Sequence, residues 1–205
     1  FREFKRAWDP QNRMNPGKLI DAREVHADLR LGADYRPRPV DTHFRFPDPH
    51  DKGSFANATL RCVGVGACRK TDTGVMCPSY MATLEEKHST RGRAHLLWEM
   101  LQGEVIADLW RSDAVKDALD WCLACKGCRS DCPTHTDMAA YKAEFMSHYF
   151  ESRRRPRQAW SMGRIGEWAP FAARFPNLVN RLSSTALAKM VAGIARERAS
   201  PRFAQ

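Results

Sequence analysis

Apolar residues recur at helical spacing in the central part of the chain. The first such stretch predicts a helix over about 84–102, because Thr83-Leu84-Glu85-Glu86 has the spacing of a capping box and Gly103 is a suitable stop. Its apolar positions are Leu96, Leu97, Met100 and Leu101. A second helix is predicted from Ser112 or Asp113 up to the next cysteine, with Val115, Leu119 and Trp121 on related faces.

A third helix is predicted after Cys132-Pro133, with Thr134 or Thr136 as its N-terminal cap. Its apolar stripe consists of Met138, Tyr141, Phe145 and Tyr149. The core of the chain is therefore expected to be helical, and cysteines flank these helices in the intervening loops.

The two ends of the chain have a different pattern. Residues 1–20 contain the turn signals Asp9-Pro10 and Asn15-Pro16-Gly17, which suggest the end of a domain. Residues 21–55 are polar and rich in proline, which predicts a surface linker with one short strand at Thr42 to Phe46. Beyond Arg157, short amphipathic segments alternate with prolines; the last, 178–194, is expected either to pack on its own protein, which we favour, or to lie on a membrane.

These patterns predict a mainly α fold that is divided into four segments. The segments are 1–20, the tail of one domain; 21–55, a linker; 56–152, a helical domain; and 153–205, an amphipathic helical extension. Because the chain begins without methionine and inside a patterned segment, we expect it to be a fragment of a longer protein.

The formal net charge of +9 suggests an acidic partner such as nucleic acid or a membrane surface. Much of the excess lies in Arg153, Arg154, Arg155 and Arg157, and metal-bound thiolates would offset part of the rest. We therefore expect no nucleic-acid partner. The absence of a long apolar run or a secretory leader predicts a cytoplasmic segment with at most peripheral membrane contact.

The seven cysteines fall into two groups. One group is Cys62, Cys68 and Cys77, and the other is Cys122, Cys125, Cys128 and Cys132. An odd number of clustered cysteines indicates metal binding more than disulfide bonds.

Residues 122–133, CLACKGCRSDCP, have the spacing C-x2-C-x2-C-x3-C-P with which bacterial ferredoxins hold cubane clusters. In that run three thiolates bind one cluster and the fourth cysteine, followed by proline, binds the other. Cys77-Pro78 repeats this signature. The predicted ligands of a [4Fe-4S] cluster are therefore Cys77, Cys122, Cys125 and Cys128, which leaves Cys62, Cys68 and Cys132 for a second cluster.

The second set has one thiolate fewer because valine occupies position 65, where the regular spacing would place a cysteine. The second cluster is then [3Fe-4S], which we slightly favour, or [4Fe-4S] with a non-cysteine ligand such as water, Asp72 or a histidine; an empty site is a third reading. His135 is the histidine expected to approach a cluster. Arg91 and Arg93 either donate hydrogen bonds toward a cluster or are ordinary surface residues.

A zinc site and a redox dithiol fit the cysteines less well. Structural zinc sites normally use two well-separated C-x2-C pairs, unlike the three closely spaced cysteines and Cys-Pro found here. A redox dithiol at Cys122 and Cys125 would leave five thiols unexplained.

Two parts of the sequence resemble known families. FKRAWDPQNRMNPGK, residues 4–18, resembles the closing segment of FAD-linked oxidases of the vanillyl-alcohol oxidase type. RCVGVGACRK, MCPSYMATLEEKHSTRGRA and CLACKGCRSDCPTHTDMAAYKAEF resemble the helical dicluster ferredoxin segment of glycolate oxidase iron-sulfur subunits. The same segment is fused behind the flavin domain in large D-lactate or D-2-hydroxyglutarate dehydrogenases.

This resemblance implies an electron-transfer segment of an FAD-dependent 2-hydroxyacid dehydrogenase. FAD would lie in a part preceding residue 1, the flavin domain of the same polypeptide would donate electrons, and a quinone or an electron-transfer flavoprotein would accept them. No catalytic residue is expected in this chain, so the fragment alone should be inactive. The alternative, a cluster- or zinc-bearing basic regulatory module, does not account for the NPGK segment.

Overall fold

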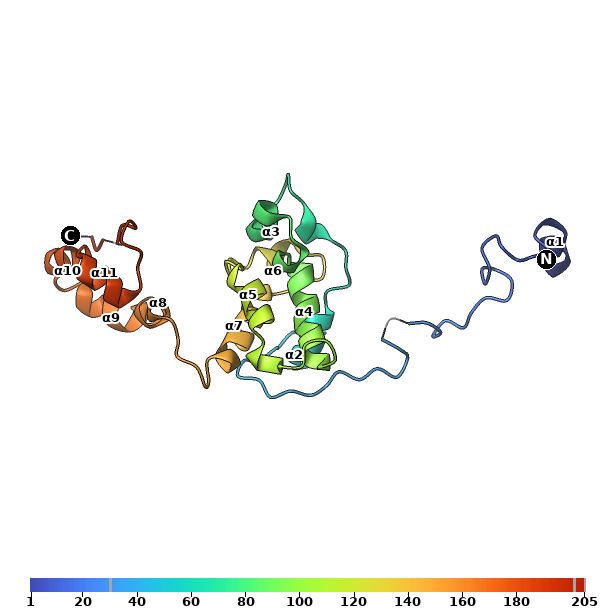
Figure 1. Cartoon of the computed structure of the whole chain (residues 1–205), viewed down its shortest axis with the longest axis horizontal. Coiled ribbons are helices and arrows are strands. Elements are labelled where there is room, and N and C mark those ends of the chain that lie inside the picture. Colours follow the sequence, from blue (N-terminus) through green and yellow to red (C-terminus); the bar gives the residue numbers. More distant parts are fainter. Residues whose placement is uncertain (30, 201, 205) are drawn as a thin grey trace. The chain divides into compact units, whose positions relative to one another are not determined.

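A computed structural model describes residues 1–29, 31–200 and 202–204, and these residues form helices and connecting loops without a β-strand (Figure 1). The prediction of a mainly α chain is confirmed. The chain divides into two compact units, Phe1–Val40 and Asp41–Gln205, which are described separately.

The first unit contains helix α1, Arg2–Trp8, followed by turns and coil. Asp9 organises the turn after this helix. Its carboxylate accepts backbone hydrogen bonds from Arg13 and Met14, both at 2.8 Å, and a side-chain hydrogen bond from Lys5 at 2.6 Å. The hydrogen bond from Lys5 is the main reason that the pKa of Asp9 falls to about 2.

The core of the second unit is built around helix α4, Thr90–Gln102. This helix contacts α2, Phe55–Leu60, α5, Asp113–Asp120, and α7, Met138–Tyr149. Their facing sides supply the apolar core, in which the largest fully buried side chains include Phe55, Leu97, Met100, Leu101, Val115, Leu119 and Phe145. Burial of such side chains from water is the main term that holds the helices together.

The predicted helix over 84–102 is interrupted near its start. Leu84 has a left-handed backbone (φ 57°) and ends α3, Pro78–Thr83; the 3₁₀ turn η2, Glu86–His88, follows. The residue that caps α4 is Ser89, whose hydroxyl accepts the backbone N–H of Gly92 at 2.9 Å, so the capping box proposed at Thr83 is wrong. The predicted stop at Gly103 is confirmed by its left-handed C-cap.

The other two predicted helices are present, with differences at their ends. Ser112 caps α5, as predicted, but Trp121 lies past its end and is 54% exposed. Asp137, not a threonine, caps α7 by accepting the backbone N–H of Ala140 at 3.1 Å. The apolar stripe predicted for α7 is buried.

The strand predicted at residues 42–46 is wrong, and part of the predicted linker belongs to the core. The backbone N–H groups of His43 and Phe44 donate to the buried carboxylate of Glu144, at 2.9 and 2.8 Å, instead of to a neighbouring strand. Phe46 is buried, with its ring 5.2 Å from that of Phe55. Residues from about 43 onward therefore pack on α2 and α7.

Shorter elements complete the second unit. The 3₁₀ turns η1, Ala67–Arg69, and η3, Leu109–Arg111, and helix α6, Gly127–Asp131, lie in the connections between the core helices. The C-terminal helices are α8, Arg157–Ser161, α9, Ile165–Ala172, α10, Pro176–Ser183, and α11, Ala186–Ala192. Pro170 falls within α9, whereas Pro176 begins α10, where its missing N–H is harmless.

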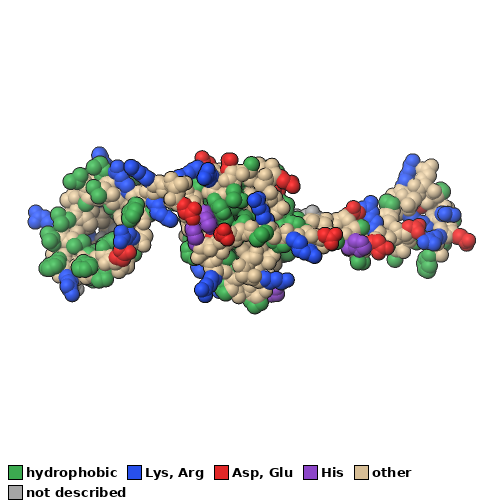
Figure 2. Space-filling model, turned by 90° about the horizontal axis from the view of Figure 1, so that it is seen from below, with side chains coloured by type: hydrophobic (Ala, Val, Ile, Leu, Met, Phe, Trp, Pro, Cys, Tyr) green, Lys and Arg blue, Asp and Glu red, His purple; other side chains and the backbone are tan. Residues whose placement is uncertain are grey.

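The C-terminal helices expose apolar side chains, which are visible as green patches in Figure 2. Those on the last two helices are Leu178, Leu182, Leu187, Met190 and Val191. None of the helices in the described residues combines the length and the apolarity needed to cross a bilayer.

Candidate metal centre

The structure gathers the seven cysteines around two separate cavities. Four of them, Cys77, Cys122, Cys125 and Cys128, line one cavity. The other three, Cys62, Cys68 and Cys132, line a second cavity. The two groups match the ligand sets inferred from spacing, although the sets themselves stay a prediction. Thr90, the first residue of α4, lines both cavities.

The loop that carries Cys122, Cys125 and Cys128 is curled by two non-glycine residues with left-handed backbones, Ala124 (φ 53°) and Lys126 (φ 60°). Such conformations cost free energy and are found where a loop must wrap closely around a site. Gly127 begins α6, and a Cβ there would lie 3.2 Å from a methyl group of Val75. A larger residue at this position would require Val75 to shift by a few tenths of an ångström.

Cys77 enters the first cavity from the start of α3 and also has a left-handed backbone (φ 51°). Pro78 occupies the first turn of that helix, where its missing N–H is tolerated. The sequence pair Cys-Pro therefore places a thiol directly at a helix start.

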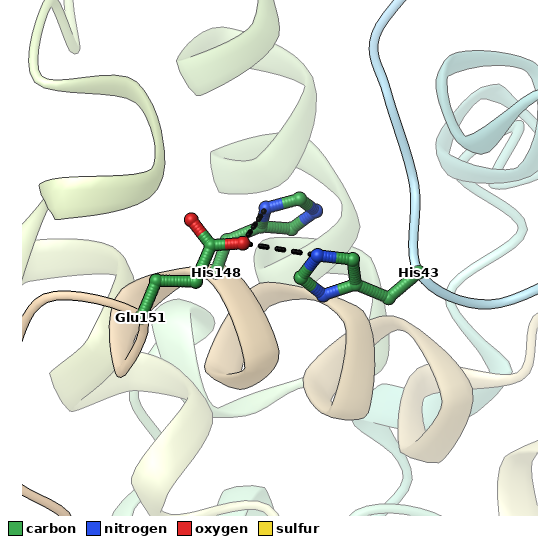
Figure 3. A group of neighbouring side chains, drawn as sticks. All are labelled: His43, His148 and Glu151. Carbon is green, nitrogen blue, oxygen red and sulfur yellow. Dashed lines mark ion pairs between the residues drawn. The ribbon is translucent and has the colours of Figure 1, made fainter.

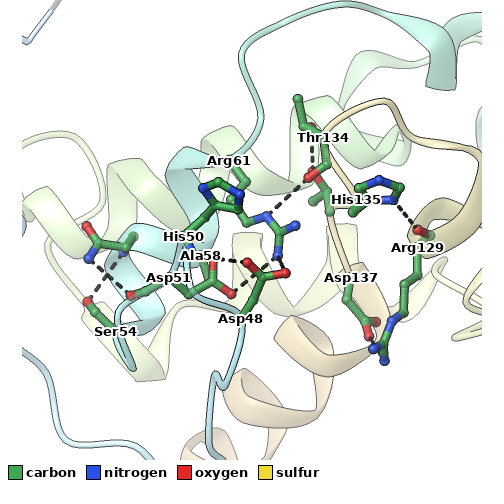
Figure 4. A network of polar contacts seen from close by, with 12 residues as sticks. Asp48, His50, Asp51, Ser54, Ala58, Arg61, Arg129, Thr134, His135 and Asp137 are labelled. Atoms are coloured by element: carbon green, nitrogen blue, oxygen red, sulfur yellow. Dashed lines mark hydrogen bonds and ion pairs between the residues drawn. The ribbon is translucent and has the colours of Figure 1, made fainter.

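Arg61 joins the segments that hold the second group of cysteines (Figure 4). Its Nε donates to the carbonyl of Thr134 at 3.1 Å, and its Nη1 lies 3.0 and 3.4 Å from the carboxylates of Asp48 and Asp51. Because Arg61 precedes Cys62 and Thr134 lies two residues after Cys132, these contacts hold the two thiol-bearing loops together.

N–H and hydroxyl groups point at the sulfurs of both cavities. The backbone N–H of Thr90 donates to Cys77 Sγ at 2.9 Å, that of Arg91 to Cys68 Sγ at 3.4 Å, and that of Met138 to Cys128 Sγ at 3.4 Å. The N–H groups of Thr90 and Arg91 are free to do so because the first turn of α4 has no intrahelical acceptors for them. Hydrogen bonds of this kind stabilise thiolates and raise the potential of metal centres bound to them.

The protonation of the thiols reflects competition between burial and these donors. Burial raises the pKa of Cys62 and of Cys128. For Cys132 burial acts in the same sense, but hydrogen bonds from Thr134 and Thr136 outweigh it and lower the pKa. A hydrogen bond from the Cys77 thiol lowers the pKa of Cys68 to about 6, and the same contact raises the pKa of Cys77.

Cys68, Cys77 and Cys128 are buried and accept hydrogen bonds at sulfur. Such thiols fit a metal group that binds them as thiolates, because metal binding displaces the proton that burial favours. A single ion is a poor match. Sulfur ligands of a tetrahedral zinc ion, with bonds of about 2.3 Å, lie about 3.8 Å apart. Among the described residues no three cysteine sulfurs lie within 4.8 Å of one another. A polynuclear iron-sulfur group holds its thiolates further apart than a single ion does, because each thiolate binds a different iron.

The sequence left open whether Arg93 lies beside a cluster or on the surface. Its side chain is among the largest fully buried ones, so the surface reading is wrong for this residue. It lines the four-cysteine cavity and donates to the carbonyl of Ala118 at 2.7 Å and to Ser79 Oγ at 2.9 Å. Burial lowers its pKa, while the neighbouring thiols Cys122, Cys77 and Cys128 act in the opposite direction.

Arg91 lines the three-cysteine cavity and is ion-paired with Glu86 at 3.0 Å, with its side chain 41% exposed. His135 does not line either thiol cavity; its Nδ1 lies 3.0 Å from the carbonyl oxygen of Arg129, so the expectation of a cluster contact is wrong (Figure 4).

The described residues that line the three-cysteine cavity include no Asp, Glu or His, and Asp72 is exposed elsewhere. Val65 is among the lining residues. The oxygen side chains that remain as protein ligands there are the hydroxyls of Thr90 and Thr134.

Comparison with known proteins supports this reading of the cysteines. Residues 58–136 match the family model described as a 4Fe-4S dicluster domain. This part of the chain is a dicluster iron-sulfur domain. The predicted resemblance is thereby confirmed for the residues that include all seven cysteines.

The dicluster domain and its flanks are similar to parts of longer enzymes. The chain is 30% identical over 218 residues to the D-2-hydroxyglutarate dehydrogenase of Pseudomonas putida, covering 88% of this chain and 21% of that protein. It is 27% identical to the enzyme of the same name from Escherichia coli K12, with the same coverage of 88% and 21%. The chain thus spans about a fifth of the length of these relatives.

A third relative matches the cysteine-bearing region alone. The glycolate oxidase iron-sulfur subunit of Escherichia coli K12 is 32% identical over 80 residues, covering 38% of this chain and 17% of that protein. No solved structure matches the chain significantly. The names of these relatives are those of dehydrogenases and of a subunit of an oxidase.

Proposed function

We propose that this chain is the electron-transfer segment of an FAD-dependent 2-hydroxyacid dehydrogenase, in which it passes electrons singly from flavin to a downstream acceptor. The observation that carries the proposal is the pair of thiol-lined cavities on either side of Thr90, at the start of α4. Two redox groups held against the same helix start would form a short relay. Iron-sulfur groups supply one-electron chemistry that amino acid side chains do not.

The proposed ligands of the first group, a [4Fe-4S] cluster, are Cys77, Cys122, Cys125 and Cys128. Arg93 supports this assignment, because a buried positive charge beside four thiolates compensates part of their negative charge. Lys142 lies nearby, donating from Nζ to the carbonyl of Cys122 at 2.8 Å and helping to hold the loop.

The second group would be bound by Cys62, Cys68 and Cys132, as [3Fe-4S] or as [4Fe-4S] with one non-cysteine ligand. The lining residues favour [3Fe-4S], because no carboxylate or imidazole among them can complete a cube. Thr90 and Thr134 would then serve as hydrogen-bond donors to sulfur.

The wider setting is also part of the proposal. The flavin domain would belong to the same polypeptide, as the resemblance of residues 4–18 to flavin-dependent oxidases suggests. The electron acceptor would be a quinone or an electron-transfer flavoprotein. The names of the relatives suggest D-2-hydroxyglutarate as a substrate of the whole protein. We propose a cytoplasmic setting without a nucleic-acid partner, in which the exposed apolar side chains of α10 and α11 support peripheral membrane contact.

The test is low-temperature EPR on anaerobically purified chain, oxidised and after dithionite, with iron, sulfide and zinc counted on the same sample. We expect a three-iron signal when oxidised, a four-iron signal when reduced, and about seven irons per chain. Zinc without sulfide would refute the electron-transfer proposal.

Two matched variants test the role of position 65. Val65→Cys places a thiol at the regular spacing in the three-cysteine cavity and should replace the oxidised three-iron signal with a second reduced four-iron signal. Val63→Cys adds a thiol to the same lining out of register and should leave the spectrum unchanged. Identical spectra for all three proteins would contradict the assignment of a three-iron cluster.

A further inference from the structure

A cluster of two histidines and a glutamate lies apart from the cysteines, where residue 43 crosses the end of α7 (Figure 3). Glu151 Oε1 lies 2.9 Å from His43 Nε2 and 3.5 Å from His148 Nδ1. The three atoms fall within 4.8 Å of one another. Figure 3 shows both imidazole rings directed at the same carboxylate oxygen.

The remaining ring nitrogens have fixed partners, which determines where the ring lone pairs point. Ser147 Oγ donates to the carbonyl of Glu144 at 2.7 Å, so it accepts from His43 Nδ1, also at 2.7 Å. His148 Nε2 lies 2.7 Å from Glu144 Oε1, an acceptor that also receives a backbone N–H from His43. When neutral, the His43 ring therefore carries its proton on Nδ1 and the His148 ring carries its proton on Nε2. The other two nitrogens, His43 Nε2 and His148 Nδ1, direct their lone pairs at Glu151.

Two lone pairs that face a carboxylate oxygen repel it unless a cation lies between them. The distances fit a metal ion in that position. Nitrogen and oxygen ligands of a tetrahedral zinc ion, with bonds of about 2.0–2.2 Å, are about 3.3 Å apart. The two distances to Glu151, 2.9 and 3.5 Å, lie on either side of this value.

The surroundings resemble those of histidine ligands in metal sites. A carboxylate that accepts the second N–H of a ligand histidine orients the ring and raises its basicity. Glu144 has this position behind His148, and its side chain is fully buried. The ring of His148 is stacked between those of Trp110, at 4.3 Å, and His43, at 4.1 Å. The side chains of His43 and Glu151 are 46% and 56% exposed, so an ion and a water ligand can reach the cluster.

We propose that His43, His148 and Glu151 bind a divalent first-row transition-metal ion, of which zinc fits the ligands best. The ion would join residue 43, at the start of the second unit, to the end of α7. It would thereby hold the segment that leads into the dicluster domain against that helix. The proposal is independent of the identity of the groups bound by the cysteines.

The test uses anaerobic, iron-loaded chain, in which the cysteines are occupied, dialysed against zinc at a series of free concentrations. The variants are His43→Ala and Glu151→Gln, and the matched control is His95→Ala. His95 also lies beside a glutamate, with its Nε2 3.8 Å from Glu99, and stacks on Trp98, but it lacks a second histidine. Zinc is counted per chain, and X-ray absorption at the zinc edge identifies the ligand atoms.

We expect one zinc per chain, with nitrogen and oxygen ligands only, in the wild type and in His95→Ala. Both site variants should weaken binding by tenfold or more, and Ser147→Ala, which removes the partner of His43, by about 10- to 100-fold. Unchanged binding in Glu151→Gln, an exposed near-isosteric change that keeps the iron content, would overturn the proposal. Sulfur among the zinc ligands would also overturn the proposal. The absence of zinc uptake would overturn it too, and would mean that protons on the two rings, and not a metal ion, balance the charge of Glu151.

Discussion

Arg93 allows the sharpest test of the electron-transfer proposal. The guanidinium is fully buried and lines the cavity of Cys77, Cys122, Cys125 and Cys128. A reduced cluster carries one more negative charge than an oxidised one, so a fixed positive charge nearby favours reduction. Replacing Arg93 with methionine should therefore lower the reduction potential of the group in this cavity.

The size of the shift follows from Coulomb's law. For a charge about 7 Å from the cluster centre and an effective dielectric constant of about 20, the interaction is about 2.4 kcal/mol. At about 59 mV per tenfold change in a one-electron equilibrium, this corresponds to a potential lower by about 100 mV. Screening by water is weak here because Arg93 is buried.

The assay is an EPR-monitored redox titration of the four-iron signal in the wild type, Arg93→Met and Arg93→Lys. The lysine variant loses hydrogen bonds to Ser79 and Ala118 but keeps the charge, so its potential should stay within about 30 mV of the wild-type value. Arg91→Gln is a second control, because Arg91 lines the other cavity and is partly exposed. Equal shifts in the lysine and methionine variants, or no shift in either, would refute the electrostatic reasoning.

Three further predictions concern stability. Gly92→Ala should cost about 1–3 kcal/mol and lower the melting temperature, because its Cβ would meet a backbone carbonyl oxygen at 1.9 Å; Gly166→Ala, with nothing within 4 Å, is the control. Phe46→Ala should cost about 3–5 kcal/mol in thermal or denaturant unfolding, whereas Phe44→Ala, at a residue 48% exposed, should cost much less; similar costs would contradict the packing of residues 43–54 on the core. Burial lowers the pKa of His88, so its contribution to stability is present above pH about 6.5 and is lost as the pH falls through the folded-state pKa; melting curves of His88→Gln should show a smaller decline than wild type between pH 7.5 and 5.5.

The sequence predicted the helices of the core because their signals are local. Val115 and Leu119 on α5, and Tyr141 and Phe145 on α7, repeat at the helical period and are buried as expected. The boundaries were less predictable, since several residues can cap the same helix. Ser89 caps α4 because the chain makes a 3₁₀ turn just before it, and the sequence gives no local signal for that turn.

The contacts that the sequence could not predict join residues far apart in the chain. The segment around His43 looked like a linker with a strand because its partner, the carboxylate of Glu144, lies about 100 residues away. Arg93 and Arg91 are chemically alike in sequence, and their different burial depends on which face of α4 packs against α5. A signal did exist for Arg93: it is four residues before Leu97, a predicted core position on the same helix face.

The positions of the thiols can be derived more fully from sequence than the protein groups that tune them. The structure places the cysteines around two cavities in the grouping that their spacing predicts, because the longer x3 interval and the following proline turn Cys132 away from Cys122, Cys125 and Cys128. The N–H donors to Cys77 and Cys68 come instead from the first turn of α4, thirteen and twenty-three residues further on. That turn serves both cavities only because Gly92 lets it approach the carbonyl of Glu86, where any larger residue would collide. The geometry of the helix start, more than the cysteine spacing, therefore places hydrogen-bond donors between the two proposed redox groups and should control the difference in their potentials.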